Sequence, residues 1–434
     1  MARGGVAALG GVALAALLAA ACAGGGAQQT PTPGPSLPAS VRPAGSPAAT
    51  LTAAPAWAPE IAYVEPDSND IWLMAADGTG KRNLSQGRCL GARGLEWSPE
   101  GDRIACIGSD SETLVLLFDL EGRLLLRLQH AGYFRSFFTW RANFASLWAP
   151  DGRNLAYVVE EEVTPVPGGG PPRGTPVLVI ADATEGVLAS ITGGQQPRWS
   201  ADGGRLAYNK PPGDTLALYE LASGEEKTLG EGLRPLAWVL GDKALLVAAH
   251  YQEQELGDTQ VTYEANLLDP ATTQMTRVPE LDNYAEFWLS PDRDTAVVSS
   301  PRGPGLGLLD LLSLQFTPIV DSVIGFPSEF IPHSQLAFSS DGSQIYWADQ
   351  GGWAPRATYK ANIDGTGLKK MGGVPGWFVG FSPDLTRMLY FPSSGTPGGL
   401  WVANIDGSDA RLVAEKASDA VWRPLVSLEE PGSQ

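Results

Sequence analysis

Short apolar runs alternate with turn residues along the chain from about residue 60 to residue 424. The runs are rich in Val, Ile, Thr, Tyr, Phe and Trp, the residues that strands prefer, and Gly, Pro and Asp separate them. The chain holds 52 Gly and 35 Pro, a composition that favours many turns over long helices. We therefore expect an all-β protein.

One sequence element returns along the chain at intervals of 39 to 51 residues. It consists of an aromatic residue, a Ser-Pro-Asp-Gly turn or a variant of that turn, and a short apolar strand. The copies begin at Trp97, Trp148, Trp199, Trp238, Trp288, Phe338 and Phe381, and a last fragment surrounds Trp422. A second element, an Asp-Gly hairpin turn, follows Ala76, Ile363 and Ile405. Each repeat thus reads as four short antiparallel strands, which is typical of a β-propeller blade.

The number of repeats predicts a single β-propeller of about eight four-stranded blades. Seven is the alternative, because Trp57-Ala58-Pro59 looks like a vestigial copy of the aromatic strand. Residues 61–85 supply three strands of the first blade, and residues 419–423 supply its fourth strand from the far end of the chain. Pairing the N-terminal and C-terminal strands closes the ring and leaves no sheet edge open at the junction.

The first 21 residues have the form of a signal peptide, with Arg3 before an apolar run. The run ends in Leu18-Ala19-Ala20-Ala21-Cys22, which resembles a bacterial lipobox, although Ala19 stands where that motif prefers Leu. In a lipobox the Cys thiol is acylated and becomes the mature N-terminus. We expect an exported protein held by a lipid on Cys22, at the outer face of the cytoplasmic membrane, in the periplasm or at the cell surface. An ordinary signal peptide with a coincidental Cys is the alternative.

The segment that follows is expected to be a tether. Residues 22–58 are rich in Pro, Gly, Ala and Ser and carry one charge, Arg42, so they cannot bury enough apolar surface to fold. The expected organisation is a signal peptide at 1–21, a lipid-anchored tether at 22–58, the propeller at 59–425 and a tail at 426–434. The remaining cysteines, Cys89 and Cys106, form either a disulfide or two separately buried thiols.

The two repeated turns resemble those of the TolB-type, WD-repeat-like propeller family over roughly residues 61–424. Similar repeats occur in TolB, a periplasmic partner protein, and in the propellers of dipeptidyl peptidase IV and tricorn-type proteases. The resemblance implies the propeller fold and is weak for function. TolB has an α/β domain before its propeller, where this chain has the tether, and the peptidases have a hydrolase domain after theirs.

The connections of uneven length predict where a partner binds. The two repeated turns share one face, and the opposite face carries the insertions at 131–146, 160–175, 251–260, 321–334, 349–356 and 371–376. Long loops on a rigid scaffold are where function usually lies. The predicted binding residues on this face are Trp140, Arg141, His250, Tyr251, His333, Trp353 and Trp377. For the aromatic cluster around Trp140, a loop folded onto its own small core is the alternative.

Composition and motifs narrow the classes of function. The formal net charge of −18 disfavours binding to nucleic acid. Sequence motifs for a serine nucleophile, a zinc protease or a nucleotide-binding loop do not occur, and the three histidines lack ligand spacing. We expect a monomer without cofactor or metal, which contacts the membrane only through its lipid and binds an envelope or extracellular protein, peptide or glycan. A propeller hydrolase or lyase acting on extracellular carbohydrate or peptide is the alternative.

Overall fold

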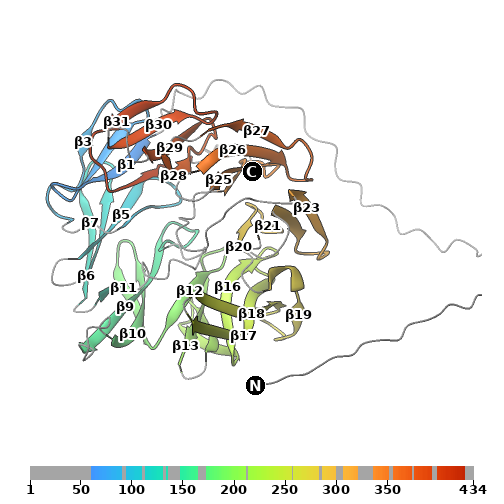
Figure 1. Ribbon diagram of the computed structural model, residues 1–434. Coiled ribbons are helices and arrows are strands. Elements are labelled where there is room, and N and C mark those ends of the chain that lie inside the picture. The colour runs from blue at the N-terminus through green and yellow to red at the C-terminus, as the bar shows by residue number, and fades with distance from the viewer. Residues whose placement is uncertain are drawn as a thin grey trace, which may run out of the picture. The chain divides into compact units, whose positions relative to one another are not determined.

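The computed structural model describes residues 60–89, 94–109, 113–130, 133–134, 147–164, 173–211, 214–256, 258–282, 286–299, 306–320, 336–350, 355–373, 376–392 and 398–425. Within these ranges the chain forms eight four-stranded antiparallel sheets, which follow one another around a ring (Figure 1). The predicted all-β propeller of eight blades is confirmed. Apart from strands and turns, these ranges contain one short 3₁₀ helix, η1 (Pro279–Leu281).

The strands of each blade are given from the innermost outward. Blade 1 contains β32 (Asp419–Trp422), β1 (Glu60–Glu65), β2 (Asp70–Ala75) and β3 (Arg82–Asn83). Blade 2 contains β4 (Gly94–Trp97), β5 (Arg103–Ser109), β6 (Thr113–Asp119) and β7 (Leu124–His130). Blade 3 contains β8 (Tyr133–Phe134), β9 (Asn154–Thr164), β10 (Arg173–Asp182) and β11 (Gly186–Thr192). Blade 4 contains β12 (Gln195–Trp199), β13 (Arg205–Lys210), β14 (Thr215–Glu220) and β15 (Glu225–Gly230).

Blade 5 contains β16 (Leu233–Val239), β17 (Ala244–Leu256), β18 (Asp258–Leu268) and β19 (Met275–Arg277). Blade 6 contains β20 (Glu286–Leu289), β21 (Thr295–Ser299), β22 (Leu306–Asp310) and β23 (Phe316–Val320). Blade 7 contains β24 (Leu336–Phe338), β25 (Gln344–Gln350), β26 (Pro355–Asn362) and β27 (Lys369–Gly372). Blade 8 contains β28 (Gly376–Phe381), β29 (Arg387–Pro392), β30 (Leu400–Asn404) and β31 (Arg411–Ala414).

The ring closes by pairing strands from the two ends of the propeller. Strand β32 pairs antiparallel with β1, with Trp422 opposite Ile61 and Asp419 opposite Val64. Arg423 extends this junction, because its guanidinium donates to the carboxylate of Glu60 and to the carbonyl of Gly101 in blade 2. The predicted two-ended first blade is therefore confirmed.

The hydrophobic core is divided among the interfaces between blades. The described residues form eight buried clusters, and each cluster joins two neighbouring blades, including blades 8 and 1. Neighbouring residues of one strand serve different clusters: Ile61 of β1 packs against blade 8, and Ala62 packs against blade 2. Both faces of a blade are thus buried, which explains why its strands read as continuous apolar runs.

Cys89 and Cys106 form a disulfide that joins blade 1 to blade 2, with their Cα atoms 6.5 Å apart. Both cysteines are buried in the cluster between these blades. Of the two alternatives that the sequence left open, the structure has the disulfide.

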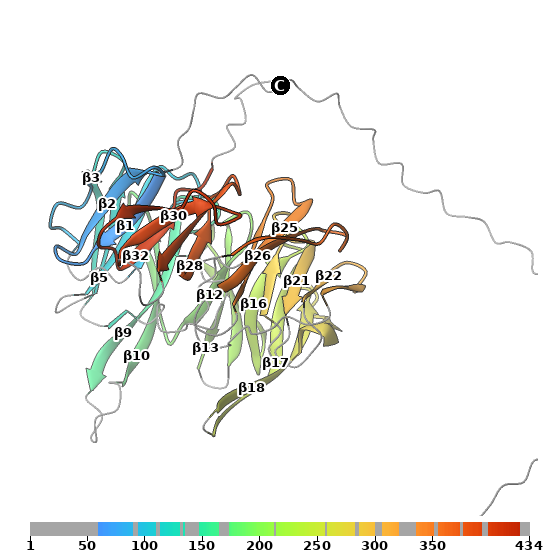
Figure 2. The same cartoon turned by 45° about the horizontal axis from the view of Figure 1, so that its top comes forward.

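Several of the predicted loop insertions contain strand residues. Strands β17 and β18 continue to Leu256 and from Asp258, through the expected loop at 251–260, and β9 and β10 extend into the expected loop at 160–175. The two hairpins project from the same side of the ring (Figure 2). Strand β8 likewise lies inside the expected insertion at 131–146 and pairs with β9. These segments are rich in polar residues, so they lack the apolar run on which the strand prediction depended.

Candidate functional site

The innermost strands converge on the axis of the ring and end close together. Strand β12 contacts both β9 and β16 of the neighbouring blades, and β32 contacts β4 and β28. Most of these strands end at a large apolar residue, which is followed by a short turn into the next strand. In blade 3 the corresponding residue is Trp148, which forms an isolated antiparallel β-bridge with Leu155 beyond the end of β8.

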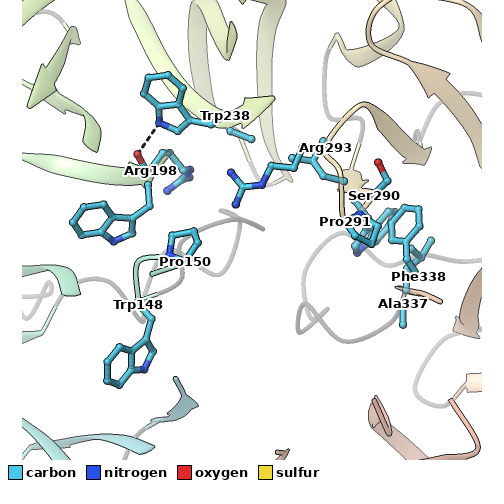
Figure 3. Close-up of a pocket in the computed structure, with 14 residues that line it drawn as sticks. Trp148, Pro150, Arg198, Trp238, Ser290, Pro291, Arg293, Ala337 and Phe338 are labelled. Carbon is cyan, nitrogen blue, oxygen red and sulfur yellow. Dashed lines mark hydrogen bonds between the residues drawn. The ribbon is translucent and has the colours of Figure 1, made fainter. Parts of the chain in front are cut away.

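A cavity of about 370 Å³ lies where the innermost strands of blades 3 to 7 end (Figure 3). Its walls combine four indoles, one phenyl ring, small apolar side chains and two guanidinium groups. The lining residues are Trp148, Pro150, Arg198, Trp199, Ala237, Trp238, Trp288, Leu289, Ser290, Pro291, Arg293, Leu336, Ala337 and Phe338. This described lining includes two cations and no acidic side chain.

Arg198 is a buried cation in the wall of the cavity. Only 4 % of the residue is exposed. Its guanidinium donates to two backbone carbonyls, those of Leu236 (2.8 Å) and Pro197 (2.8 Å). Burial lowers the pKa of Arg198 to about 10, so the group still carries its charge at neutral pH.

Trp238 helps to hold Arg198 and the adjoining wall in place. Its indole N–H donates to the backbone carbonyl of Arg198 at 3.0 Å (Figure 3). The guanidinium of Arg205 lies over the Trp238 ring, 4.5 Å from the centroid, in a cation–π contact. The wall between blades 4 and 5 is therefore cross-linked by polar contacts as well as by packing.

Arg293 is the second cation, and it reaches from the turn of blade 6 toward the side of the cavity where Arg198 and Trp238 lie (Figure 3). Burial lowers the pKa of Arg293, and the charge of Asp242 acts in the opposite direction. The carboxylate of Asp242 is engaged elsewhere, since it accepts the backbone N–H groups of Ala201 (2.8 Å) and Asp202 (3.1 Å).

The structure describes only some of the residues predicted to bind a partner. Trp377 lies at the start of β28, with 38 % of the residue exposed, at the opposite end of the innermost strand from the turns that border the cavity. His250 and Tyr251 lie in β17 at a bulge, where the two residues oppose one residue of β18, and their side chains are outside the described part. The lipid-attachment residue and the other binding residues are also outside it: Cys22, Trp140, Arg141, His333 and Trp353. These assignments therefore stay predictions.

Arg198 and Arg293 were not among the residues predicted from the sequence, although Arg293 departs from the repeated turn. Arg293 has a φ of 60°, and the matching turn position is Gly101 (63°), Gly152 (66°), Gly203 (69°) or Gly342 (67°) in four other blades and Leu385 (55°) in blade 8. In blade 6 the repeat is also offset by one residue, because Leu289 takes the place of the aromatic and Trp288 takes the place of Arg198.

The described residues contain neither a helix with the length and apolarity needed to span a bilayer nor a cluster of three or more potential metal ligands. His130, one of the three histidines, instead forms a 2.7 Å hydrogen bond with the Tyr157 hydroxyl.

Comparison with known proteins shows the fold alone. The chain matches no family model, and no curated protein matches its sequence. It resembles the solved structure of the dihydro-heme d1 dehydrogenase NirN in complex with DHE (TM-score 0.54, 16 % identity, 86 % of this chain and 78 % of that chain). It also resembles a eukaryotic initiation factor (TM-score 0.50, 16 % identity, 84 % and 98 %) and, less well, TolB from Acinetobacter baumannii (TM-score 0.34, 17 % identity, 74 % and 82 %). The likeness to the first two supports a β-propeller and leaves the function open.

Proposed function

We propose that the chain is an exported, lipid-anchored β-propeller that acts as a binding module at the cell envelope, with a ligand held in the axial cavity. The observation that carries the proposal is the cavity itself, an apolar and aromatic pocket with a few polar groups at its wall. Pockets of this size and composition are the usual sites for small ligands or for short segments of larger ones. The ligand is a small molecule, or part of a protein, peptide or glycan of the envelope.

The predicted loop face provides a second surface for a larger partner. Trp377 is exposed there, and two hairpins, β9–β10 and β17–β18, project from the ring. An exposed indole on a rigid scaffold is a common anchor for a partner. We keep this face in the proposal as the place where a protein or glycan contacts the propeller outside the cavity.

The rival function is that of a hydrolase or lyase. Such chemistry needs a general acid and a general base within reach of one bond, often a pair of carboxylates. The described lining of the cavity contains neither an acidic side chain nor a histidine. This observation favours the binding module.

Native mass spectrometry of the full chain, purified from its own envelope in mild detergent, tests the cavity. We expect a bound ligand on the wild type, and its loss when Ala337→Trp fills the cavity. Leu312→Ser is the matched control, because Leu312 is 81 % exposed and lies away from the cavity lining. Equal occupancy of the wild type and a folded Ala337→Trp variant would exclude the cavity as the site.

A pull-down from envelope extracts tests the loop face separately. The variant carries Trp140→Ala, Trp353→Ala and Trp377→Ala and must first show the circular dichroism of the wild type. We expect a partner that the wild type retains and this variant loses. An unchanged partner list would remove the loop face from the proposal, and the cavity would then be judged by mass spectrometry alone.

A further inference from the structure

Of the two cations at the cavity, Arg198 is buried and Arg293 is half-buried, and the charge of Asp242 acts on Arg293. Among the described residues, neither Arg198 nor Arg293 forms an ion pair, although fifteen other carboxylate–cation contacts are present. Burial lowers the pKa of Arg198 to about 10, as expected for a guanidinium that is removed from water. Charged groups are rarely buried in proteins without a partner of opposite sign, because removing the charge from water is costly.

The charge of the whole chain makes this arrangement more unusual. The chain has 48 acidic residues against 30 basic ones, so acids are plentiful. Acidic side chains do lie near the cavity, but they point to other partners: Asp242 binds backbone N–H groups, and Asp292 accepts a hydrogen bond from Ser290. The fold therefore leaves two cations facing a cavity whose described lining supplies no anion.

We propose that the cavity binds a small organic anion, whose carboxylate or phosphate group pairs with Arg198 and Arg293 and whose flat apolar body lies among the indoles. This inference rests on the proposed function and names the class of ligand. A guanidinium presents parallel N–H groups that fit carboxylate and phosphate oxygens. The cavity is much larger than either group alone, and its remaining wall is aromatic and apolar, so an inorganic anion would leave most of it unfilled.

Matched pairs of probes separate the contribution of charge from that of shape. We would measure binding of 2-naphthoate and phenyl phosphate against 2-naphthamide and phenol by isothermal titration with the full chain in detergent. The anions are expected to bind at least about tenfold more tightly than the neutral probes, because hydrogen bonds to charged groups are the stronger ones. Equal affinity for 2-naphthoate and 2-naphthamide would overturn the inference.

Three variants link the charge effect to the cavity. Arg293→Gln and Arg198→Gln are each expected to weaken 2-naphthoate binding by roughly tenfold or more and to leave 2-naphthamide unchanged. Arg293→Gln is the cleaner variant, because no side-chain hydrogen bond of Arg293 to a described residue is lost, and circular dichroism checks both folds. Arg127→Gln is the control, since Arg127 lies exposed on the outer strand β7 and donates to Gln129. A control as impaired as the cavity variants would also overturn the inference.

The remaining outcomes distinguish this inference from the proposed function. If both naphthyl probes bind equally and Ala337→Trp abolishes both, the cavity is a ligand site without preference for anions. If none of the probes binds at millimolar concentration and native mass spectrometry finds no ligand, both the inference and the cavity proposal fail. If inorganic phosphate or chloride competes as strongly as 2-naphthoate, the site accepts any small anion. That outcome would overturn the inference that the ligand has an apolar organic body.

Discussion

At the scale of single residues, the repeated turn after the innermost strand owes its sequence to one hydrogen-bonding pattern. In blade 8 the Ser382 hydroxyl donates to Asp384 (2.5 Å) and accepts the backbone N–H of Arg387 (2.9 Å). The serines of blades 4, 6 and 7 make the same two kinds of bond, at Ser200, Ser290 and Ser339. The Ser-x-Asp pattern could therefore be recognised in the sequence. The role of Arg293 in the same turn could not, because it depends on Arg198 and Trp238 on the other side of the cavity.

Ser382→Ala tests this pattern. Ser382 is fully buried, so its removal leaves the N–H of Arg387 without its acceptor, and we expect the free energy of unfolding to fall by about 1–3 kcal/mol. Ser408→Ala is the control, because Ser408 donates to Asp406 in an exposed turn, and its loss should cost less than about 0.5 kcal/mol. Urea denaturation measures both. Equal losses for the two variants would show that burial of the serine does not matter.

At the scale of the strand, the sequence predicted elements well where both faces are buried and poorly elsewhere. The runs around Ile61 and Leu206 are apolar because alternate residues pack against different neighbouring blades. The distal halves of β17 and β18 form a hairpin that projects from the ring and are rich in Gln, Glu and Thr, a composition that predicts a loop. Apolar periodicity reports burial, so a polar segment gives no such signal even where it forms a strand.

The closing strand β32 carries a buried carboxyl whose titration should be visible in stability. Burial raises the pKa of Asp419 to about 6, against an ordinary value of 3.8, and the backbone N–H groups of Ala420 and Leu95 oppose the shift. The unfolded chain therefore releases this proton near pH 4 and the folded chain near pH 6. The charged carboxylate therefore lowers the free energy of unfolding increasingly from pH 4 to pH 6, and by its full amount above pH 6.

Asp419→Asn removes that penalty. We expect the variant to be more stable than the wild type at pH 7 and nearly equal to it at pH 4. Because the side chain keeps some contact with solvent, the gain at pH 7 should be smaller than the roughly 3 kcal/mol that the pKa difference implies. Urea denaturation at the two pH values provides the comparison. A stability change that is the same at both pH values would mean that the carboxyl is not the titrating group.

At the scale of the whole molecule, the repeat predicted the ring but could not predict the cavity. Blade number and closure follow from counting copies and from the two half-blades at the ends of the propeller. The cavity is built by five blades at once, and Arg198 and Arg293 come from different copies of the repeat. Connections of uneven length differ visibly between copies and therefore draw the prediction of a binding face, whereas a single substituted position inside a regular copy is a much weaker signal.

The Cys89–Cys106 disulfide bears on the proposed location of the molecule. An exported propeller would keep the bond between blades 1 and 2, because disulfides persist outside the reducing cytosol. Export with a lipid on Cys22 makes a specific prediction: the wild type incorporates an alkyne-labelled fatty acid, and Cys22→Ser does not. The double variant Cys89→Ser/Cys106→Ser is the matched control, because it removes both other thiols and should keep the label. A labelled Cys22→Ser protein, or a mature N-terminus other than Cys22 by mass spectrometry, would refute the lipid anchor, and the propeller would then act as a freely diffusing binding protein.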